Sequence, residues 1–237
     1  MQTADAGDRQ LETLRLYGRL VDVRDDWGGC LVLCCGAGCA ASGAPAAVSI
    51  AGGATMAIDA DADAVKAAMR RGELDFVVNT LDEALRALKN QVRQRRPLSV
   101  GLTADVDAAL CEMVERGVLP DLLLTGAHQA AQPILQNESI RELQAAGMLV
   151  RSIDGPDDDR HTRRSMDPSR DRFGEHYLPA VNAADLRALD ERVLAILPAE
   201  EMVRRRWIER VAQYLREARR GGRWVWLTEE ERQRLGD

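Results

Sequence analysis

The chain has 237 residues, a formal net charge of -6 and five cysteines. It is long enough to bury a sizeable core, in one large domain or in a domain with an appendage. The negative charge argues against a nucleic-acid partner, and no apolar run reaches the ~18 residues that a membrane span needs. The acidic, polar N-terminus differs from a secretory signal, and the cysteine usage fits a reducing compartment, so we predict a cytoplasmic protein.

The first half of the chain alternates between helical and strand-like patterns. Residues 9–23 carry leucines at mostly helical spacing and predict a first helix, and residues 30–35 are a short apolar run that predicts a buried strand. Further strands are predicted at 54–58, 74–78, 97–102, 121–124 and 148–150, and further helices at 46–51, 63–71, 81–95, 105–116 and 138–146. This alternation predicts an α/β fold with a Rossmann-like doubly wound parallel sheet.

The character of the sequence changes after this pattern. We predict a Rossmann-like domain over 1–153, a polar linker over 154–181 and a helical C-terminal extension over 182–237. One helix of the extension, predicted at 199–219, carries an apolar stripe that suits either a core or a partner surface, and its arginines are interpreted as a solvated face. Residues 224–227 and a helix capped at Thr228 are predicted to form a docking tail.

A glycine-rich turn follows the first predicted strand. Gly36-Ala37-Gly38-Cys39-Ala40-Ala41 has the G-x-G-x-x-G/A form of the dinucleotide-binding fingerprint, and Asp59 stands where an acid on the cofactor ribose is expected, ~20 residues on. The glycines permit a tight turn, and the helix that follows offers free N–H groups and a positive dipole end to phosphate. The alternative is a turn rich in small residues that binds no ligand.

The strand predicted at 121–124 ends in Thr125-Gly126-Ala127-His128. Because ligands of open α/β sheets lie outside the carboxyl ends of the strands, Thr125 and His128 are candidate site residues, although His128 equally fits an ordinary loop histidine. The cysteines at 30, 34, 35 and 39 contain no C-x-x-C pair, so we predict small core hydrophobes rather than a thiolate metal site or a disulfide framework.

The segment from about Leu11 to Gln132 resembles the NAD-binding middle domain of urocanase, the urocanate hydratase of histidine breakdown. The family motif GLGGMGGAQP, followed by LAATMAGG, aligns without gaps on residues 36–53. Similar stretches continue through Asp59 and Asp61 and through residues 72–75, 81–85, 97–102 and 116–121. The segment at 125–128 is similar to the family's TSAH if two residues are lost before it.

The resemblance implies bound NAD and a lyase that hydrates urocanate or a related imidazole or acrylate substrate. It implies these cofactor-binding residues: Gly36, Gly38, Ala41, Ser42, Gly43, Asp59, Asp61 and Thr125. His128 and Asp105 are the candidate catalytic residues, and no metal is implied.

The chain also departs from the family pattern. Ala41 and Ser42 replace two glycines, Ala44 replaces a glutamine, and the family's GNA step reads Ala104-Asp105-Val106. We find neither the family's cysteine motif nor room for its catalytic domain. A second hypothesis is therefore a non-catalytic or partner-dependent dinucleotide-binding module that forms a homodimer, or pairs with another chain, through its C-terminal helices. A hydride-transferring dehydrogenase ranks third, because no distinct substrate domain follows.

Overall fold

The structure is a computed structural model, and it describes residues 2–35, 39, 42–125, 134–152 and 173–236. Its first part contains α1 (Gln2–Val23), β1 (Leu31–Cys35), α2 (Ala44–Ala51), β2 (Ala54–Asp59), α3 (Ala62–Arg71), β3 (Phe76–Val78), α4 (Leu81–Arg93), β4 (Leu98–Thr103), α5 (Val106–Glu115), β5 (Leu122–Thr125), α7 (Glu138–Ala145) and β6 (Leu149–Ser152). The second part contains β7 (Gly174–Pro179), α8 (Ala183–Ile196), α9 (Met202–Tyr214), η2 (Arg216–Arg219), β8 (Gly222–Leu227) and α10 (Glu229–Gly236).

The centre of the fold is a six-stranded sheet in the order β3-β4-β2-β1-β5-β6, with every neighbouring pair parallel. Side chains of β1 alternate between the two faces. Val32 and Cys34 join the core that contains α1, α2 and α9, whereas Leu33 and Cys35 join the core that contains α4, α5 and α7. Helices therefore cover both faces, which confirms the predicted Rossmann-like α/β class.

Capping residues and glycines largely determine where the helices of this part begin and end. Thr80 caps α4 by accepting a hydrogen bond from the Glu83 N–H, and Gly72 ends α3 in the left-handed region with a φ of 84°. Gly52 ends α2 in the same way, with a φ of 100°. Local sequence signals were sufficient to locate these helix ends, because each capping residue bonds backbone groups in the adjacent turn of the same helix.

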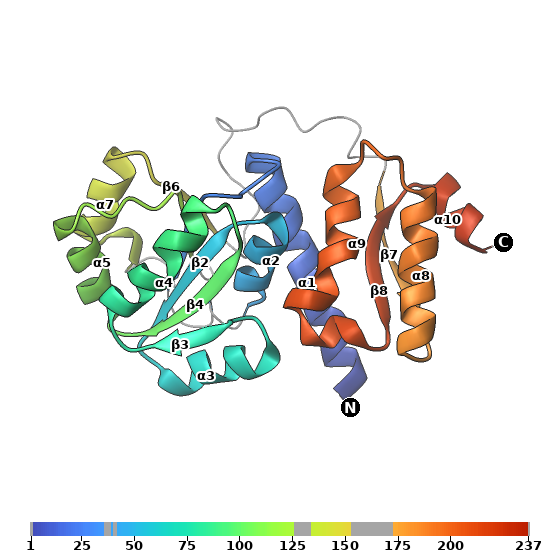
Figure 1. The fold of residues 1–237 in the computed structure, drawn as a ribbon, viewed down its shortest axis with the longest axis horizontal. Coiled ribbons are helices and arrows are strands. Elements are labelled where there is room, and N and C mark those ends of the chain that lie inside the picture. The colour runs from blue at the N-terminus through green and yellow to red at the C-terminus, as the bar shows by residue number, and fades with distance from the viewer. Residues whose placement is uncertain (1, 36–38, 40–41, 126–133, 153–172, 237) are drawn as a thin grey trace.

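The residues after 173 include two strands as well as helices. β7 and β8 form an antiparallel pair in which His176 is opposite Val225. Residues 224–227 of the predicted docking tail therefore belong to a strand, on which Trp226 stacks against Tyr17 of α1. The helix predicted after Thr228 is present as α10, and the Thr228 hydroxyl accepts the Glu231 N–H. In Figure 1, α1 lies between the six-stranded sheet and these C-terminal elements.

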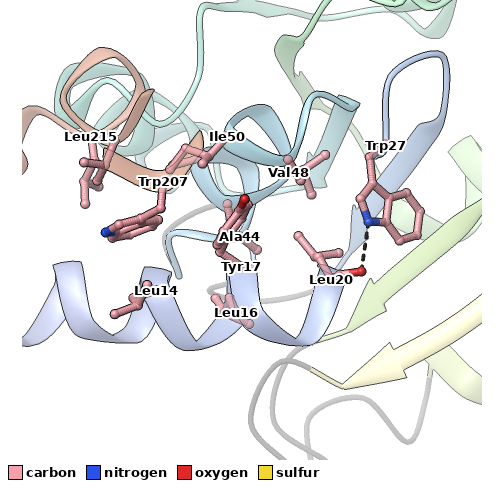
Figure 2. Close-up of a cluster of buried hydrophobic side chains, with 14 of the residues drawn as sticks. Leu14, Leu16, Tyr17, Leu20, Trp27, Ala44, Val48, Ile50, Trp207 and Leu215 are labelled. Atoms are coloured by element: carbon pink, nitrogen blue, oxygen red, sulfur yellow. Dashed lines mark hydrogen bonds between the residues drawn. The ribbon is translucent and has the colours of Figure 1, made fainter. Parts of the chain in front are cut away.

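One hydrophobic core includes residues from both parts of the chain. Figure 2 shows this cluster, with Tyr17 of α1 and Trp207 of α9 drawn near residues of α2. The Tyr17 hydroxyl donates to the Val203 carbonyl at 2.8 Å, and the Trp207 indole N–H donates to the Trp224 carbonyl at 2.8 Å. The apolar stripe of α9, for which core and partner surface were both open, is thus buried within the chain at Trp207, Ile208 and Val211, whereas Met202 at its start is exposed.

Two C-terminal arginines are buried, and one of them, Arg204 of α9, contradicts the interpretation of that helix's arginines as a solvated face. Arg204 is 5% exposed and pairs with Glu231 at 2.7 Å, while Arg223 is fully buried and pairs with Asp190. Burial alone would raise the pKa of Glu231, but hydrogen bonds from Arg204 and Thr228 outweigh it and hold that pKa below its usual value. The first pair joins α9 to α10 and the second joins β8 to α8, and the sequence pattern reveals neither contact.

Removing one partner of the buried Arg204–Glu231 pair is expected to destabilise the fold. We expect Arg204→Ala to lower the free energy of unfolding by about 3–5 kcal/mol, because Glu231 would remain buried without its partner. Chemical denaturation followed by circular dichroism measures this change. Arg232→Ala is the matched control, since Arg232 pairs with Glu229 on the exposed surface and its loss is expected to leave the midpoint unchanged. Equal midpoints for both variants would contradict the expectation.

Candidate functional site

The strand order creates a topological switch point between β1 and β5. From β1 the chain passes through α2 to β2 on one side, whereas from β4 it passes through α5 to β5 on the other side. Cys35, the last residue of β1, is opposite Thr125 at the end of β5 and opposite Ile58 in β2. Ligands of open α/β sheets bind at such carboxyl ends, so the candidate site lies here.

The N-terminus of α2 points toward this edge of the sheet and has a capping pattern suited to an anion. Gly43 is its N-cap without a side-chain hydrogen bond, and the first turn contains no acidic residue. By contrast, α3, α4, α5, α7 and α8 each have a side-chain cap and an acidic residue in the first turn. The positive end of the α2 dipole is therefore not neutralised by a protein carboxylate, which fits a bound phosphate.

Ser42 and Gly43 are held in place from two directions. The Ser42 hydroxyl donates to the Cys39 carbonyl at 2.7 Å and accepts from the Ala44 N–H at 3.3 Å. Gly43 has a φ of 78°, and a β-carbon there would collide with the Oγ1 of Thr13 in α1. The left-handed backbone and the contact with α1 both require glycine at this position.

The structure separates the roles of the two neighbouring acids. Asp59 ends β2, is 8% exposed and accepts the Asp61 N–H at 2.9 Å. Asp61 is the N-cap of α3, and its Oδ1 accepts the N–H groups of Asp63 and Ala64 at 2.9 and 3.2 Å. Asp59 thus lies at the strand end beside the switch point, while Asp61 has a structural role in starting the next helix.

Two other predicted site residues have local structural partners. Asp105 is exposed and caps α5, with its Oδ1 accepting the Ala108 N–H at 2.9 Å. The Thr125 hydroxyl is buried and donates to the Arg151 carbonyl at 3.5 Å, toward β6. The structure therefore places Thr125 at the switch point and Asp105 two strands from it, after β4. Gly36, Gly38, Ala41 and His128 lie outside the described residues.

Cys30 and Cys35 are free, buried thiols as predicted, but two other cysteines differ from the prediction. Cys34 and Cys39 form a disulfide, with their Cα atoms 5.7 Å apart, while Cys30, Cys35 and Cys111 are free. Burial raises the pKa of the Cys35 thiol to about 12. The five-residue separation in sequence was the available signal for the pairing. It was missed because the pairing depends on Cys39 lying on the same face of the sheet as Cys34, which the sequence does not indicate.

A separate cavity of about 690 Å³ opens between the end of α1 and the start of α9. Asp22, Glu201, Arg206 and Trp226 are among its lining residues. None of the predicted site residues that the structure describes lines it, and its walls come from other elements than the switch point. Among the helices that the structure describes, none is long and apolar enough to cross a membrane.

The geometry can be compared with known families. The sequence model described as the urocanase Rossmann-like domain matches residues 11–146, which is more than half of the chain. The chain belongs to the urocanase family. The match covers α1 from residue 11, the whole glycine turn and the elements as far as α7, and it leaves β6 and the C-terminal elements outside. The matched segment corresponds to the domain that binds NAD in the urocanase family.

The fit of Gly43 against α1 can be tested by a pair of alanine substitutions. Gly43→Ala is expected to lower the free energy of unfolding by about 1–3 kcal/mol, through strain at its positive φ and the collision with Thr13. Gly117→Ala, at a φ of 64° with no atom near the added β-carbon, is expected to show only backbone strain of roughly 1 kcal/mol. Urea denaturation measures both. A smaller effect at Gly43 than at Gly117 would contradict the close contact.

Proposed function

We propose that this urocanase-family chain binds NAD at the carboxyl ends of β1, β2 and β5. The observation that carries the proposal is the start of α2, where a helix without an acidic first turn follows a glycine-rich turn at the switch point. The family match over residues 11–146 supports the same ligand. A dinucleotide has both groups that such a site recognises, a pyrophosphate for the helix N-terminus and a ribose for the acid at the end of β2.

In this proposal, Ser42, Gly43 and the first turn of α2 hold the pyrophosphate, with Gly36, Gly38 and Ala41 completing the turn in the sequence motif. Asp59 accepts a hydrogen bond from the ribose hydroxyls. Its Oδ1 accepts the Asp61 N–H, which orients the carboxylate and leaves Oδ2 for the ligand. Asp61 caps α3 instead of binding the ribose. Thr125 lies beneath the bound dinucleotide at the carboxyl end of β5.

The finer proposal is a hydratase that acts on urocanate or a related imidazole or acrylate substrate. When bound, NAD supplies an electrophilic nicotinamide ring, and the protein binds, orients and transfers protons. His128 is the candidate for proton transfer, because it follows β5 at the switch point in sequence. Asp105 is the weaker candidate, since its carboxylate caps α5 beyond β2.

A second candidate is a partner-dependent dinucleotide-binding module. It is favoured by the capping roles of Asp61 and Asp105, which assign two of the predicted acids to local structure. In this case a second copy or another chain supplies the reacting groups. The apolar stripe of α9 is buried in the chain's own core, so pairing through the C-terminal helices would use other faces.

The cofactor proposal is tested by calorimetric titration of NAD⁺. Wild type is expected to bind, and Asp59→Asn is expected to bind about tenfold more weakly, because a hydrogen bond to a charged acceptor contributes about 1.5–3 kcal/mol. Asp61→Asn is the matched control and is expected to keep its affinity, since asparagine caps helices as well as aspartate does. Equal affinities of wild type and Asp59→Asn would remove the ribose role of Asp59. A wild type that does not bind would make the glycine turn purely structural.

Turnover is tested by incubating the protein with urocanate and NAD⁺ and following the absorbance of the conjugated side chain. A hydratase is expected to reduce this absorbance with time, because water addition breaks the conjugation. His128→Ala is expected to slow the reaction at least about 100-fold if that residue transfers a proton. Bound NAD⁺ without an absorbance change would favour the partner-dependent module, and light scattering with and without NAD⁺ would then report self-association.

A further inference from the structure

The C-terminal end of α2 receives part of its capping from residues that are distant in sequence. An α-helix leaves its last four carbonyl groups without partners inside the helix. In α2, the glycine pair 52–53 donates its N–H groups to the carbonyls of Val48 and Ser49, at 2.9 and 3.1 Å. The carbonyls of the last two residues, Ile50 and Ala51, need donors from outside the helix.

Two arginines of α9 provide these donors. The Arg210 guanidinium donates to the Ile50 carbonyl at 3.4 Å. The Arg206 guanidinium donates to the Ala51 carbonyl at 3.3 Å, and the same carbonyl accepts the Trp27 N–H. The two arginines are four residues apart and therefore lie on one face of α9. Because the last turn of α2 contains no basic residue, the cations at this end come from α9.

The charges of these arginines lie at the negative end of the α2 dipole. Within the part of the chain that the structure describes, neither Arg206 nor Arg210 forms an ion pair, and Asp26, which is within electrostatic range of Arg206, pairs with Arg95 at 2.9 Å. Both α9 arginines are partly buried, so salt screens their charges less than it screens exposed ones. The N-terminus of α2, by contrast, has neither an acidic residue in its first turn nor a side-chain cap.

We propose that Arg206 and Arg210 are positioning residues that strengthen pyrophosphate binding at the N-terminus of α2. The inference rests on the NAD-binding part of the proposed function. The negative end of a short helix offsets part of the attraction that its positive end exerts on an anion, and cations at the negative end remove this offset. Since α2 has eight residues and spans about 12 Å, the two charges act on the ligand without touching it.

In this proposal the C-terminal elements contribute to ligand binding as well as to the core. α9 (Met202–Tyr214) lies outside the matched residues 11–146, whereas α2 lies inside them. The charges that complement the dipole of the dinucleotide-binding helix thus come from a segment that the family model does not include.

Arg205 offers a matched control, because it makes the same kind of contact with a different helix. Its guanidinium donates to the carbonyls of Leu194 and Leu197 at 2.7 and 3.0 Å, at the C-terminal end of α8. α8 is not part of the candidate site, and its first turn already contains Asp185. Arg205→Gln is therefore expected to lower the stability of the fold, as the α2 contacts do when lost, but to leave NAD⁺ affinity unchanged.

The experiment measures NAD⁺ affinity by calorimetry in the full-length chain. Arg206→Gln/Arg210→Gln removes both charges but keeps a side-chain donor at each position, and it is expected to bind NAD⁺ at least about threefold more weakly than wild type. Arg206→Lys/Arg210→Lys keeps the charges and is expected to bind within about twofold of wild type. Circular dichroism checks that each variant is folded. If the double glutamine variant does not fold, Arg210→Gln, which loses only the 3.4 Å contact, is expected to show a loss of about twofold.

The possible outcomes separate this inference from the proposed function. Equal NAD⁺ affinities of wild type and the glutamine variant would overturn the inference and leave NAD binding intact. An equal loss of affinity in Arg205→Gln would also overturn it, because reduced stability would then be the cause. A lysine variant as weak as the glutamine variant would overturn the role of charge. If wild type does not bind NAD⁺, the proposed function itself fails, and the inference falls with it.

Discussion

The structure depends on the complete burial of α2. All eight of its residues are buried, because the sheet lies on one side and α1 and α9 cover the others. Figure 1 shows α2 in this central position. A helix surrounded in this way can carry only small side chains along its close contacts, which accounts for the alanines between Gly43 and Gly52. The composition that resembles a family motif is therefore also a packing requirement.

The same burial links the candidate site to parts of the chain that are distant in sequence. Gly43 lies against Thr13 of α1, and α1 in turn packs on Trp207 of α9 and Trp226 of β8. The C-terminal elements thus support the helix whose N-terminus faces the switch point. In this chain, this support comes from residues outside the segment that the family model matches.

Much of the first part was predictable because its signals are local. Strand runs, glycine stops and caps such as Thr80 act within a few residues, and the elements that they predicted are present. The site was predictable only in part. The position of Asp59 at a strand end followed from the motif, but the capping roles of Asp61 and Asp105 depend on where the next helices begin. The buried Arg204 was wrongly interpreted as part of a solvated face, because a charged residue in a helix gives no local sign of a distant acid.

The sequence by itself determined the parallel α/β pattern, the glycine turn with its acid, and the family to which the chain belongs. Periodicity, turn residues and motif spacing are properties of neighbouring residues, so they can be read without coordinates. Only the tertiary structure decided that Cys34 and Cys39 are joined, that α9 packs inside the chain, and that residues 222–227 form a strand beside β7. Each of these outcomes depends on contacts that the folded chain brings together, and these contacts leave no periodic signal in the sequence.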